Sequence, residues 1–253
     1  DTEVILKLYQ ERGRDCLEDL RGMFAFAIWD SRSKKLFLAR DRFGIKPLFF
    51  SNSKSFAFAS EIKAILSLGV PSTPNIGVVA RYLDLGWNGT GTETFFDGIE
   101  ALEPAHWMEW ENGQVTKGCY WKLEETVDRS IHPDDIYDEL DQALRIHMVS
   151  DIEVGISLSS GLDSRTVVQG LKRQGFNRLQ SFTFGFDELE YDEIRRVKSK
   201  EIECSALHEV RLRPNELFDA LEKQTYHFEY PSGGLGTLAQ MKLMSLAREK
   251  KIQ

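Results

Sequence analysis

Glu153-Val154-Gly155-Ile156-Ser157-Leu158-Ser159-Ser160-Gly161-Leu162-Asp163-Ser164 is the stretch that decides the fold of the second half of the chain. Residues 153–158 form a short apolar run that is typical of a buried strand. Residues 164–174 carry apolar side chains at helical spacing and predict a helix. The small residues 159–164 therefore lie at the carboxyl end of a strand and before a helix, which is where ligands bind in open α/β sheets.

The same alternation of strand and helix continues on both sides of this stretch. Strands alternating with helices indicate βαβ units and a parallel sheet, so we expect an α/β fold here. The predicted strands are residues 153–158, 179–186 and 207–212, and the predicted helices are residues 135–148, 164–174, 192–203, 215–226 and 237–250. In the first of these helices we expect Ile136, Leu140, Ala143, Leu144 and Met148 to face inward.

The first half of the chain has a different pattern, in which short apolar runs are joined by turn residues. This pattern predicts antiparallel hairpins with helices beside them, an α+β arrangement. The predicted strands are residues 23–29, 35–39, 47–50, 56–59, 107–110 and 114–121, the predicted helices are residues 2–11, 16–20 and 60–68, and residues 86–98 read as a loop. Residues 122–134 are polar and aperiodic, so we predict a linker between a domain at 1–121 and a domain at 135–253.

The chemistry of residues 159–164 suits a polyphosphate. Short hydroxyl side chains, a glycine and the start of a helix place several N–H donors and a positive dipole end around one small volume. Asp163 would repel a phosphate by itself, but it could share a Mg²⁺ ion with one. The alternative interpretation is an ordinary turn with Ser or Asp as the helix N-cap.

Composition excludes several classes of function. A net charge of −8 argues against a broad nucleic-acid surface. No apolar run approaches the ~20 residues that span a bilayer, and the start does not resemble a signal peptide, so we expect no membrane association. The three cysteines have no CxxC spacing, which predicts neither a zinc site nor a disulfide framework and favours the cytoplasm.

Residues 149–164 closely resemble the pyrophosphate-loop signature S-D-V-P-x-G-x-x-L-S-G-G-x-D-S of the glutamine-dependent asparagine synthetases. Residues 22–30, 39–48 and 58–64 independently resemble the glutaminase domain of that family. The matches run in the family's order from Asp1 to about Arg248. By this resemblance the chain is identified as a member of the family, with both ends expected to be cut.

The resemblance implies an N-terminal-nucleophile (αββα) glutaminase part and a Rossmann-like pyrophosphate-loop synthetase part, both incomplete. It implies an asparagine biosynthetic ligase that uses ATP and Mg²⁺ to convert aspartate to β-aspartyl-AMP, which ammonia from glutamine then attacks. A homodimer is a possibility that the family suggests. A relative that acts on another carboxylate, as β-lactam synthetase-like enzymes do, and a catalytically silent homologue both remain open.

Site residues are carried over from the family by position. The resemblance assigns pyrophosphate binding to the residues of the loop, and Asp163 is also assigned as a Mg²⁺ ligand. It assigns adenine contacts to residues beside the loop. It assigns binding of the α-amino group of glutamine to Asp1, which on its own would be an N-cap. The residues assigned to ATP are Ser157, Leu158, Ser159, Ser160, Gly161, Asp163, Ser164 and Phe184, the last of which could instead be a core strand residue.

The sequence departs from the family pattern in three ways. The N-terminal Cys nucleophile is absent, so we expect no catalytic residue and no glutamine hydrolysis in residues 1–253 alone. The downstream S-G-E-G-x-D-E segment is also absent, so we expect no synthesis by these residues alone. Ser160 stands where the family usually has Gly, and its Cβ would cost ~1 kcal/mol if that position requires a positive φ.

Five charged residues in or near the matching segments invite a functional interpretation. We expect Arg40, Asp41 and Lys46 to set a turn and an interface rather than to carry chemistry. For Asp192 and Glu193, a solvated helix face is the expected role.

Overall fold

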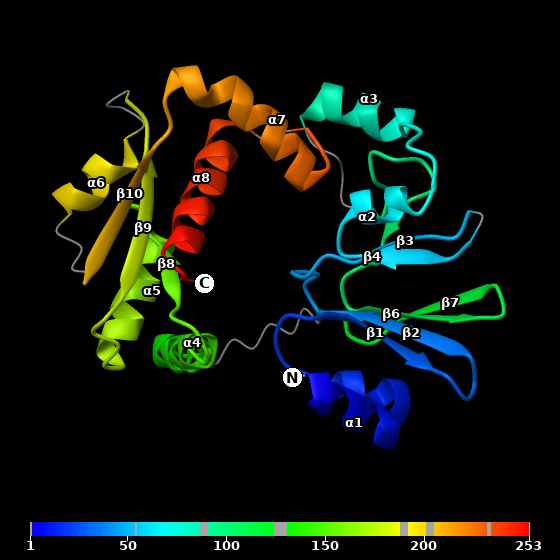
Figure 1. The fold of residues 1–253 in the computed structure, drawn as a ribbon. Coiled ribbons are helices and arrows are strands. Elements are labelled where there is room, and N and C mark those ends of the chain that lie inside the picture. The colour runs from blue at the N-terminus through cyan, green and yellow to red at the C-terminus, as the bar shows by residue number, and fades with distance from the viewer. Residues whose placement is uncertain are drawn as a thin grey trace. The chain divides into compact units, whose positions relative to one another are not determined.

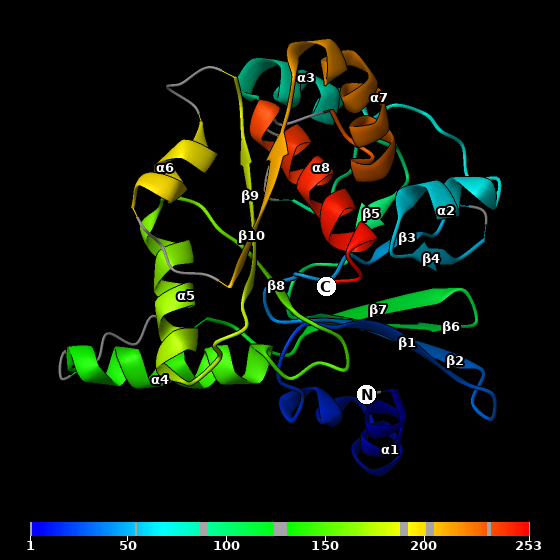
Figure 2. The same ribbon diagram turned by 60° about the vertical axis from the view of Figure 1, so that its left-hand side comes forward.

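The structure is a computed structural model that describes residues 2–53, 55–86, 91–123, 131–187, 192–200, 205–231 and 234–252. It divides the chain into two compact units, Asp1–Thr126 and Val127–Gln253, which are called unit 1 and unit 2 below. Figures 1 and 2 show mixed helices and strands in unit 1, and a small sheet with helices on both faces in unit 2.

Unit 1 contains two antiparallel sheets. One has the strand order β1-β2-β6-β7 and the other the order β4-β3-β5. The hairpins that the sequence predicts pair as expected, whereas the short strand β5 was not predicted. The strands are β1 (Ala25–Asp30), β2 (Lys35–Arg40), β3 (Phe49–Ser51), β4 (Ala57–Ala59), β5 (Glu100–Ala101), β6 (His106–Glu111) and β7 (Gln114–Cys119).

Strand β2 is buried on both faces, and this explains the layers of unit 1. Leu36 and Leu38 pack with residues of the second sheet, including Phe50 of β3. Phe37 and Ala39 point the other way, because side chains alternate along a strand, and they pack on the first helices. Helix α2 then covers the second sheet. The layers are therefore helix, sheet, sheet and helix, an α+β fold.

The helices of unit 1 are α1 (Thr2–Arg12), the 3₁₀ segment η1 (Gly13–Glu18), α2 (Ile62–Ser67) and α3 (Ile76–Leu85). Helix α3 was missed at the sequence level, although its ends carry recognisable signals. The Asn75 side chain caps its first turn by accepting from the Val78 N–H, and Gly86 ends it with a φ of 66°. Such an Asn N-cap and a left-handed Gly are common helix boundaries.

The prediction that Arg40 and Asp41 set a turn is confirmed, whereas the roles predicted for the Lys46 side chain and for an interface stay predictions. Asp41 is 1% exposed, and its carboxylate accepts from the N–H groups of Phe43, Ile45 and Lys46 at 3.2, 3.0 and 2.9 Å. The Arg40 guanidinium donates to backbone carbonyls of the same turn and to that of Leu102. The charged groups of Arg40 and Asp41 are thus engaged in hydrogen bonds with the backbone.

Unit 2 contains a three-stranded sheet with the order β10-β9-β8, and all its pairs are parallel. The parallel pairing predicted from the alternation of strands and helices is therefore confirmed. Strand β9 is central, and its residues 181–183 are buried. The strands are β8 (Gly155–Ser157), β9 (Gln180–Gly185) and β10 (Ala206–Arg211).

Helices cover both faces of this sheet (Figure 2). Helices α4, α5 and α6 contribute Leu144, Val168 and Val197 to one apolar cluster. On the other face, Leu238 and Ala239 of α8 pack against Phe184 of β9. The helices are α4 (Pro133–His147), α5 (Leu162–Arg173), α6 (Glu193–Ser199), α7 (Leu217–Phe228) and α8 (Leu235–Glu249), with the 3₁₀ segment η2 (Pro214–Glu216) before α7.

One predicted core position in α4 is wrong. Ile136 is 62% exposed, whereas Leu144 is buried and Leu140 and Met148 pack partly against it. Ile136 lies in the first turn of the helix, and the buried contacts with α5 are made near the other end. Gly170 of α5 is the close-approach point, since a Cβ there would lie 2.5 Å from the Leu144 Cδ1 atom.

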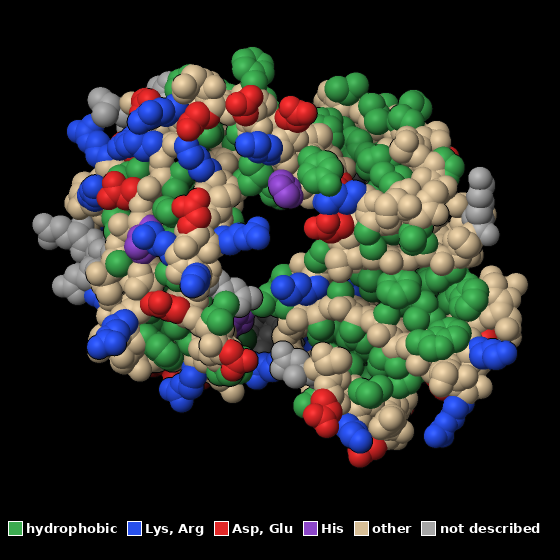
Figure 3. All heavy atoms as spheres, viewed as in Figure 1, with side chains coloured by type: hydrophobic (Ala, Val, Ile, Leu, Met, Phe, Trp, Pro, Cys, Tyr) green, Lys and Arg blue, Asp and Glu red, His purple; other side chains and the backbone are tan. Residues whose placement is uncertain are grey.

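Figure 3 shows that hydrophobic side chains gather over the visible face of unit 1, whereas charged side chains are more frequent on the visible face of unit 2. Large exposed side chains in unit 1 include Trp29 at 53% and Phe43 at 66%. In the part of the chain that the structure describes, no helix combines the length and apolarity that crossing a membrane requires.

Candidate functional site

The candidate site is the loop from Ser159 to Gly161, between β8 and α5. The Leu158 N–H donates to the Phe182 carbonyl at 2.7 Å, so pairing with β9 continues one residue beyond β8. Gly161 then acts as the N-cap of α5 with an extended backbone, φ −67° and ψ 165°. The loop therefore emerges at the carboxyl edge of the parallel sheet, as the sequence predicts.

Two serine hydroxyls hold the ends of the loop together. The Ser164 Oγ atom accepts from the Ser159 N–H and donates to the Ser159 carbonyl, both at 3.0 Å. The two Oγ atoms also lie 3.0 Å apart, and the Ser159 Oγ accepts from the Gly161 N–H at 3.2 Å. The first turn of α5 thus shapes the residues before it into a small, closed loop.

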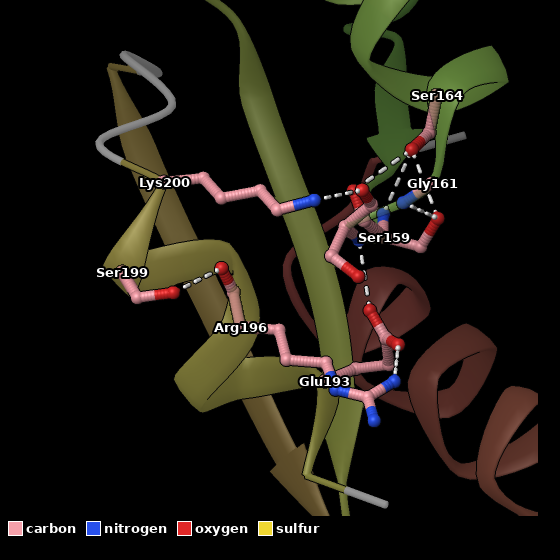
Figure 4. Close-up of polar contacts among 8 residues, drawn as sticks. Ser159, Gly161, Ser164, Glu193, Arg196, Ser199 and Lys200 are labelled. Atoms are coloured by element: carbon pink, nitrogen blue, oxygen red, sulfur yellow. Dashed lines mark hydrogen bonds and ion pairs between the residues drawn. The ribbon is translucent and has the colours of Figure 1, made fainter.

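Ser160 lies at the tip of the loop, and its backbone forms hydrogen bonds with two side chains at the two ends of helix α6. Its N–H donates to the Glu193 Oε2 atom at 2.8 Å, and its carbonyl accepts from the Lys200 Nζ atom at 3.1 Å. Figure 4 shows both side chains reaching the loop from the α6 side. The φ of Ser160 is not positive, so its backbone does not adopt the left-handed conformation that a Cβ would strain.

Glu193 is ionised at neutral pH. Burial raises the pKa of this carboxyl, but hydrogen bonds from Ser160 and from Arg196 outweigh that effect and hold the pKa below its ordinary value. The Arg196 Nη1 atom lies 3.3 Å from the Glu193 Oε1 atom. The site therefore contains a fixed negative charge that touches a loop amide.

The amino end of α5 is open to solvent. Leu162 is 76% exposed, Asp163 is also exposed, and Gly161 offers no side-chain cap. The first N–H groups of a helix have no intrahelical partner, and the helix dipole places positive potential there. This arrangement can accept an anion beside the hydroxyls of Ser159 and Ser164.

The structure brings two of the predicted adenine-side residues, Ser157 and Phe184, to one face of the sheet, whereas Leu158 packs in the cluster on the opposite face. Ser157 is exposed at the end of β8 and is paired in register with Phe182 of β9, so Phe184 is a diagonal neighbour. Phe184 is half-buried and packs edge to face on Phe186, with ring centroids 6.1 Å apart. Leu158 is buried and available only through its backbone. The adenine roles of these residues stay predictions.

Asp163 is the one carboxylate that the sequence proposed for Mg²⁺. No group of three or more His, Cys, Asp or Glu side chains suited to a metal occurs among the described residues. Mg²⁺ is nevertheless often held by one or two carboxylates together with substrate phosphates. An exposed carboxylate in the first turn of α5 fits that type of site, which forms only with the phosphates present.

The sequence-based predictions for two acidic residues at the start of α6 were wrong. Asp192, expected on a solvated face, is 4% exposed and its Oδ2 atom accepts from the Arg211 Nη2 atom at 2.9 Å. Glu193 contacts the loop. The signal was weak, because the contact with Ser160 depends on the pairing of β8 with β9 and on the packing of α6 against β9. The remaining predicted site residue, Asp1, lies outside the described residues.

Comparisons with known proteins match both parts of the chain. The family model described as a glutamine amidotransferase domain matches residues 1–121, and the model described as asparagine synthase matches residues 135–253. Asparagine synthetase [glutamine-hydrolyzing] 2 of Bacillus subtilis is 36% identical over 76% of this chain and 28% of its own length. The chain belongs to the glutamine-dependent asparagine synthetase family.

Other curated relatives align over almost the whole chain. A putative asparagine synthetase [glutamine-hydrolyzing] 2 of Methanocaldococcus jannaschii is 30% identical over 98% of this chain and 50% of its own length. Amidase chyE of Penicillium rubens is also 30% identical, over 94% of this chain and 39% of its own length. The chain thus spans half or less of the length of these relatives.

Comparison with solved structures adds little to the assignment to the asparagine synthetase family. Glutamine phosphoribosylpyrophosphate amidotransferase from B. subtilis aligns with 83% of the chain and 54% of its own, at a TM-score of 0.33 and 14% identity. A TM-score of this size establishes no common arrangement.

Proposed function

We propose that the protein is an ATP-dependent amide ligase that makes asparagine from aspartate, with ammonia released from glutamine. In this proposal unit 2 is the amino-terminal portion of a Rossmann-like pyrophosphate-loop synthetase domain. Unit 1 is the carboxyl-terminal portion of an N-terminal-nucleophile glutaminase domain. The reaction is placed in the cytoplasm, and a homodimer remains a prediction.

The observation that carries the proposal is the closed loop held by Ser159 and Ser164 at the carboxyl edge of the parallel sheet. It places the hydroxyls of Ser159 and Ser164 beside the open amino end of α5, where the first N–H groups of the helix have no intrahelical partner. Backbone N–H groups at a helix N-terminus bind phosphates without a basic patch. This fits a protein whose net charge is −8.

The chemistry assigned to the loop is activation of a carboxylate. A carboxylate is a poor electrophile, and transfer of AMP to aspartate gives β-aspartyl-AMP with pyrophosphate as the leaving group. Ser159, Ser160, Gly161 and Ser164 would line the departing pyrophosphate, and the serine hydroxyls and the first N–H groups of α5 would donate to it. Mg²⁺, held there by Asp163, would neutralise part of the phosphate charge.

The other assigned positions orient the substrates. Ser157, Leu158 and Phe184 would contact the adenine, because they lie together where β8 and β9 end. Asp1 would bind the α-amino group of glutamine in the glutaminase part. Ammonia then attacks the acyl carbon of the adenylate and expels AMP, and holding the two reactants together supplies much of the rate enhancement.

A second candidate is a ligase that acts on a different carboxylate. It is favoured by one specific observation, that relatives named amidases match this chain at 28% and 30% identity, close to the values for the asparagine synthetases. A catalytically silent homologue is less consistent with a loop in which Ser159, Asp163 and Ser164 are all retained.

The experiment that tests the proposal is exchange of labelled pyrophosphate into ATP by the full-length protein, with Mg²⁺ and a panel of carboxylic acids. Exchange that depends on aspartate is the expected result. Exchange driven by another acid would keep the nucleotide chemistry but replace asparagine synthesis with the second candidate. A folded protein that gives no exchange with any acid would refute ligase activity.

A further inference from the structure

The contact between Glu193 and Ser160 resembles the contact that a bound phosphate would make. A main-chain N–H at the tip of the loop donates 2.8 Å to a carboxylate oxygen, and that carboxylate is ionised at neutral pH. Figure 4 shows the Glu193 carboxylate directly against the loop, on the side of α6. The loop thus already holds an anion that belongs to the protein itself.

This contact connects residues 33 positions apart in the chain, so it is not a local turn or a helix cap. Glu193 is the first residue of α6, and its side chain is 23% exposed. Its position is supported from two directions. Arg196 holds the other carboxylate oxygen at 3.3 Å, and Lys200 holds the Ser160 carbonyl at 3.1 Å. The peptide groups around Ser160 are therefore held in one orientation.

An anion placed beside the phosphate position affects ligands according to their charge. Free ATP and free pyrophosphate carry roughly three to four negative charges near neutral pH, whereas their Mg²⁺ complexes carry about two fewer. A fixed carboxylate repels the free forms more strongly, since Coulomb energy scales with the product of the charges. The positive charges of Arg196 and Lys200 offset this repulsion in part.

We propose that Glu193 is a specificity-determining residue that makes the loop select metal-complexed over metal-free polyphosphates, by placing a negative charge on the Ser160 amide. This inference rests on the proposed nucleotide site, and it adds to Asp163 a second negative charge that disfavours the metal-free ligands. The ligand class is a nucleoside triphosphate or pyrophosphate that carries a divalent cation.

The substitution Glu193→Gln tests this proposal with little change of shape. The glutamine side chain has the same length and retains one oxygen that can accept from the Ser160 N–H, so the loop keeps its hydrogen bond while the charge is lost. Glu209→Gln is a matched control. It removes the same charge from β10, where the Glu209 carboxylate pairs with the Lys198 Nζ atom at 2.6 Å rather than with a loop amide.

The measurement is the affinity of the purified protein and the two variants for ATP and for inorganic pyrophosphate, by calorimetry and by the amide NMR shift of Ser160. Each titration is done once with a chelator and once with excess Mg²⁺. We expect Glu193→Gln to bind the metal-free ligands about tenfold more tightly, the scale of one unit charge a few Å away at an effective dielectric constant of roughly 40. With Mg²⁺ the gain should be about threefold or less, and Glu209→Gln should match the wild type.

Three results would overturn the inference. An equal gain with and without Mg²⁺ would mean that Glu193 does not discriminate by charge. No gain, or a loss, for the metal-free ligands would leave Glu193 as a purely structural support of the loop. Both of these leave the proposed nucleotide site intact, provided that the wild type binds Mg²⁺-ATP. A wild type that binds neither form would refute the nucleotide site and the charge selection together.

Discussion

Replacement of the buried Asp41 by Asn should destabilise unit 1 by about 3 kcal/mol. The Asp41 carboxylate is 1% exposed and accepts three backbone N–H groups, two on Oδ1 from Phe43 and Ile45 and one on Oδ2 from Lys46. An asparagine of the same shape has only one oxygen. Its NH₂ group must therefore face at least one N–H of the turn.

The magnitude follows from the hydrogen bonds that change. With the amide oxygen at the Oδ1 position, the bonds to Phe43 and Ile45 remain but lose their charge assistance, and the Lys46 N–H faces another donor. A hydrogen bond to a charged group contributes about 1.5–3 kcal/mol, and a buried donor left without a partner costs about 1–3 kcal/mol. The sum is about 3 kcal/mol for Asn in this orientation, and the flipped amide would be worse.

The difference in stability between the wild type and the Asp41→Asn variant should also depend on pH. Burial raises the pKa of Asp41, but the backbone hydrogen bonds from Lys46, Ile45 and Phe43 outweigh it and lower the pKa below its ordinary value. A carboxyl with a lowered folded pKa stabilises the protein above its unfolded pKa, about 3.9, and this stabilisation is lost as pH falls through the folded value. The two proteins should thus differ most above about pH 5 and converge below about pH 4.

The assay is urea unfolding followed by tryptophan fluorescence. All five tryptophans, at positions 29, 87, 107, 110 and 121, lie in unit 1, so their emission reports this unit selectively. A loss of about 3 kcal/mol should lower the urea midpoint by about 1.5–2 M at the slope usual for a unit of this size. Asp30→Asn is the matched control, because Asp30 accepts the N–H of Arg32 at 2.9 Å in a solvent-accessible turn, where water replaces a lost bond.

A change of less than about 1 kcal/mol, with the same pH dependence in both proteins, would refute this reasoning, since it lies below the range for a buried donor without a partner. It would mean that the turn forms without the carboxylate. Asp41 would then be free for a role in binding or catalysis, contrary to the structural role assigned to it here.

Other predictions concern the loop, the packing of unit 2 and the alkaline stability of unit 1. Ser164→Ala removes the hydroxyl that closes the loop by bonding to the N–H and the carbonyl of Ser159, so Mg²⁺-ATP affinity measured by calorimetry should fall about tenfold, while stability falls by only about 1–2 kcal/mol. Unchanged affinity would exclude this hydroxyl from the nucleotide site. Gly170→Ala should destabilise unit 2 by about 1–3 kcal/mol in thermal unfolding followed by far-UV circular dichroism, because the new Cβ would lie 2.5 Å from a leucine methyl group. Gly236→Ala, in a helix with open space around that position, should instead be neutral or stabilise by up to about 1 kcal/mol, and equal effects of the two would contradict the packing of α4 on α5. Burial raises the pKa of Tyr120 to about 12, so unit 1 should lose stability between about pH 10 and pH 12 as the unfolded phenol ionises. Tyr120→Phe should abolish that loss in pH-dependent urea unfolding, and a loss of the same size in the variant would assign it to other groups.

The elements carried by local sequence patterns were predictable. The hairpins of unit 1 and the three parallel strands of unit 2 follow from apolar period and turn residues, which act over a few positions. The loop at Ser159 was recognisable because a strand, a short run of small residues and a helix follow each other directly. The ends of α3 carried signals of the same kind in Asn75 and Gly86, yet its apolar residues were not recognised as a helix.

The conformation of Ser160 could not be derived from sequence. The sequence left two alternatives open, a positive φ strained by the Cβ of Ser160 and a hydroxyl that adds a donor to phosphate. The structure decides this point, since the φ of Ser160 is not positive and its N–H is engaged by Glu193. Ile136 shows the same limit in α4, because helical period marks an apolar face but not how far along the helix a neighbour packs.

The sequence alone therefore determined the family resemblance, the strand–loop–helix that forms the candidate nucleotide site, and the residue types that line it. Only the tertiary structure decided which charges surround that loop. Glu193 and Lys200 reach Ser160 across 33 and 40 positions, and Asp192 is buried against Arg211 across 19. These contacts depend on the pairing of β8, β9 and β10 and on the sheet face that α6 covers. The physical reason is that patterns of apolar residues specify local structure, whereas the partner of a charge is set by packing between distant segments.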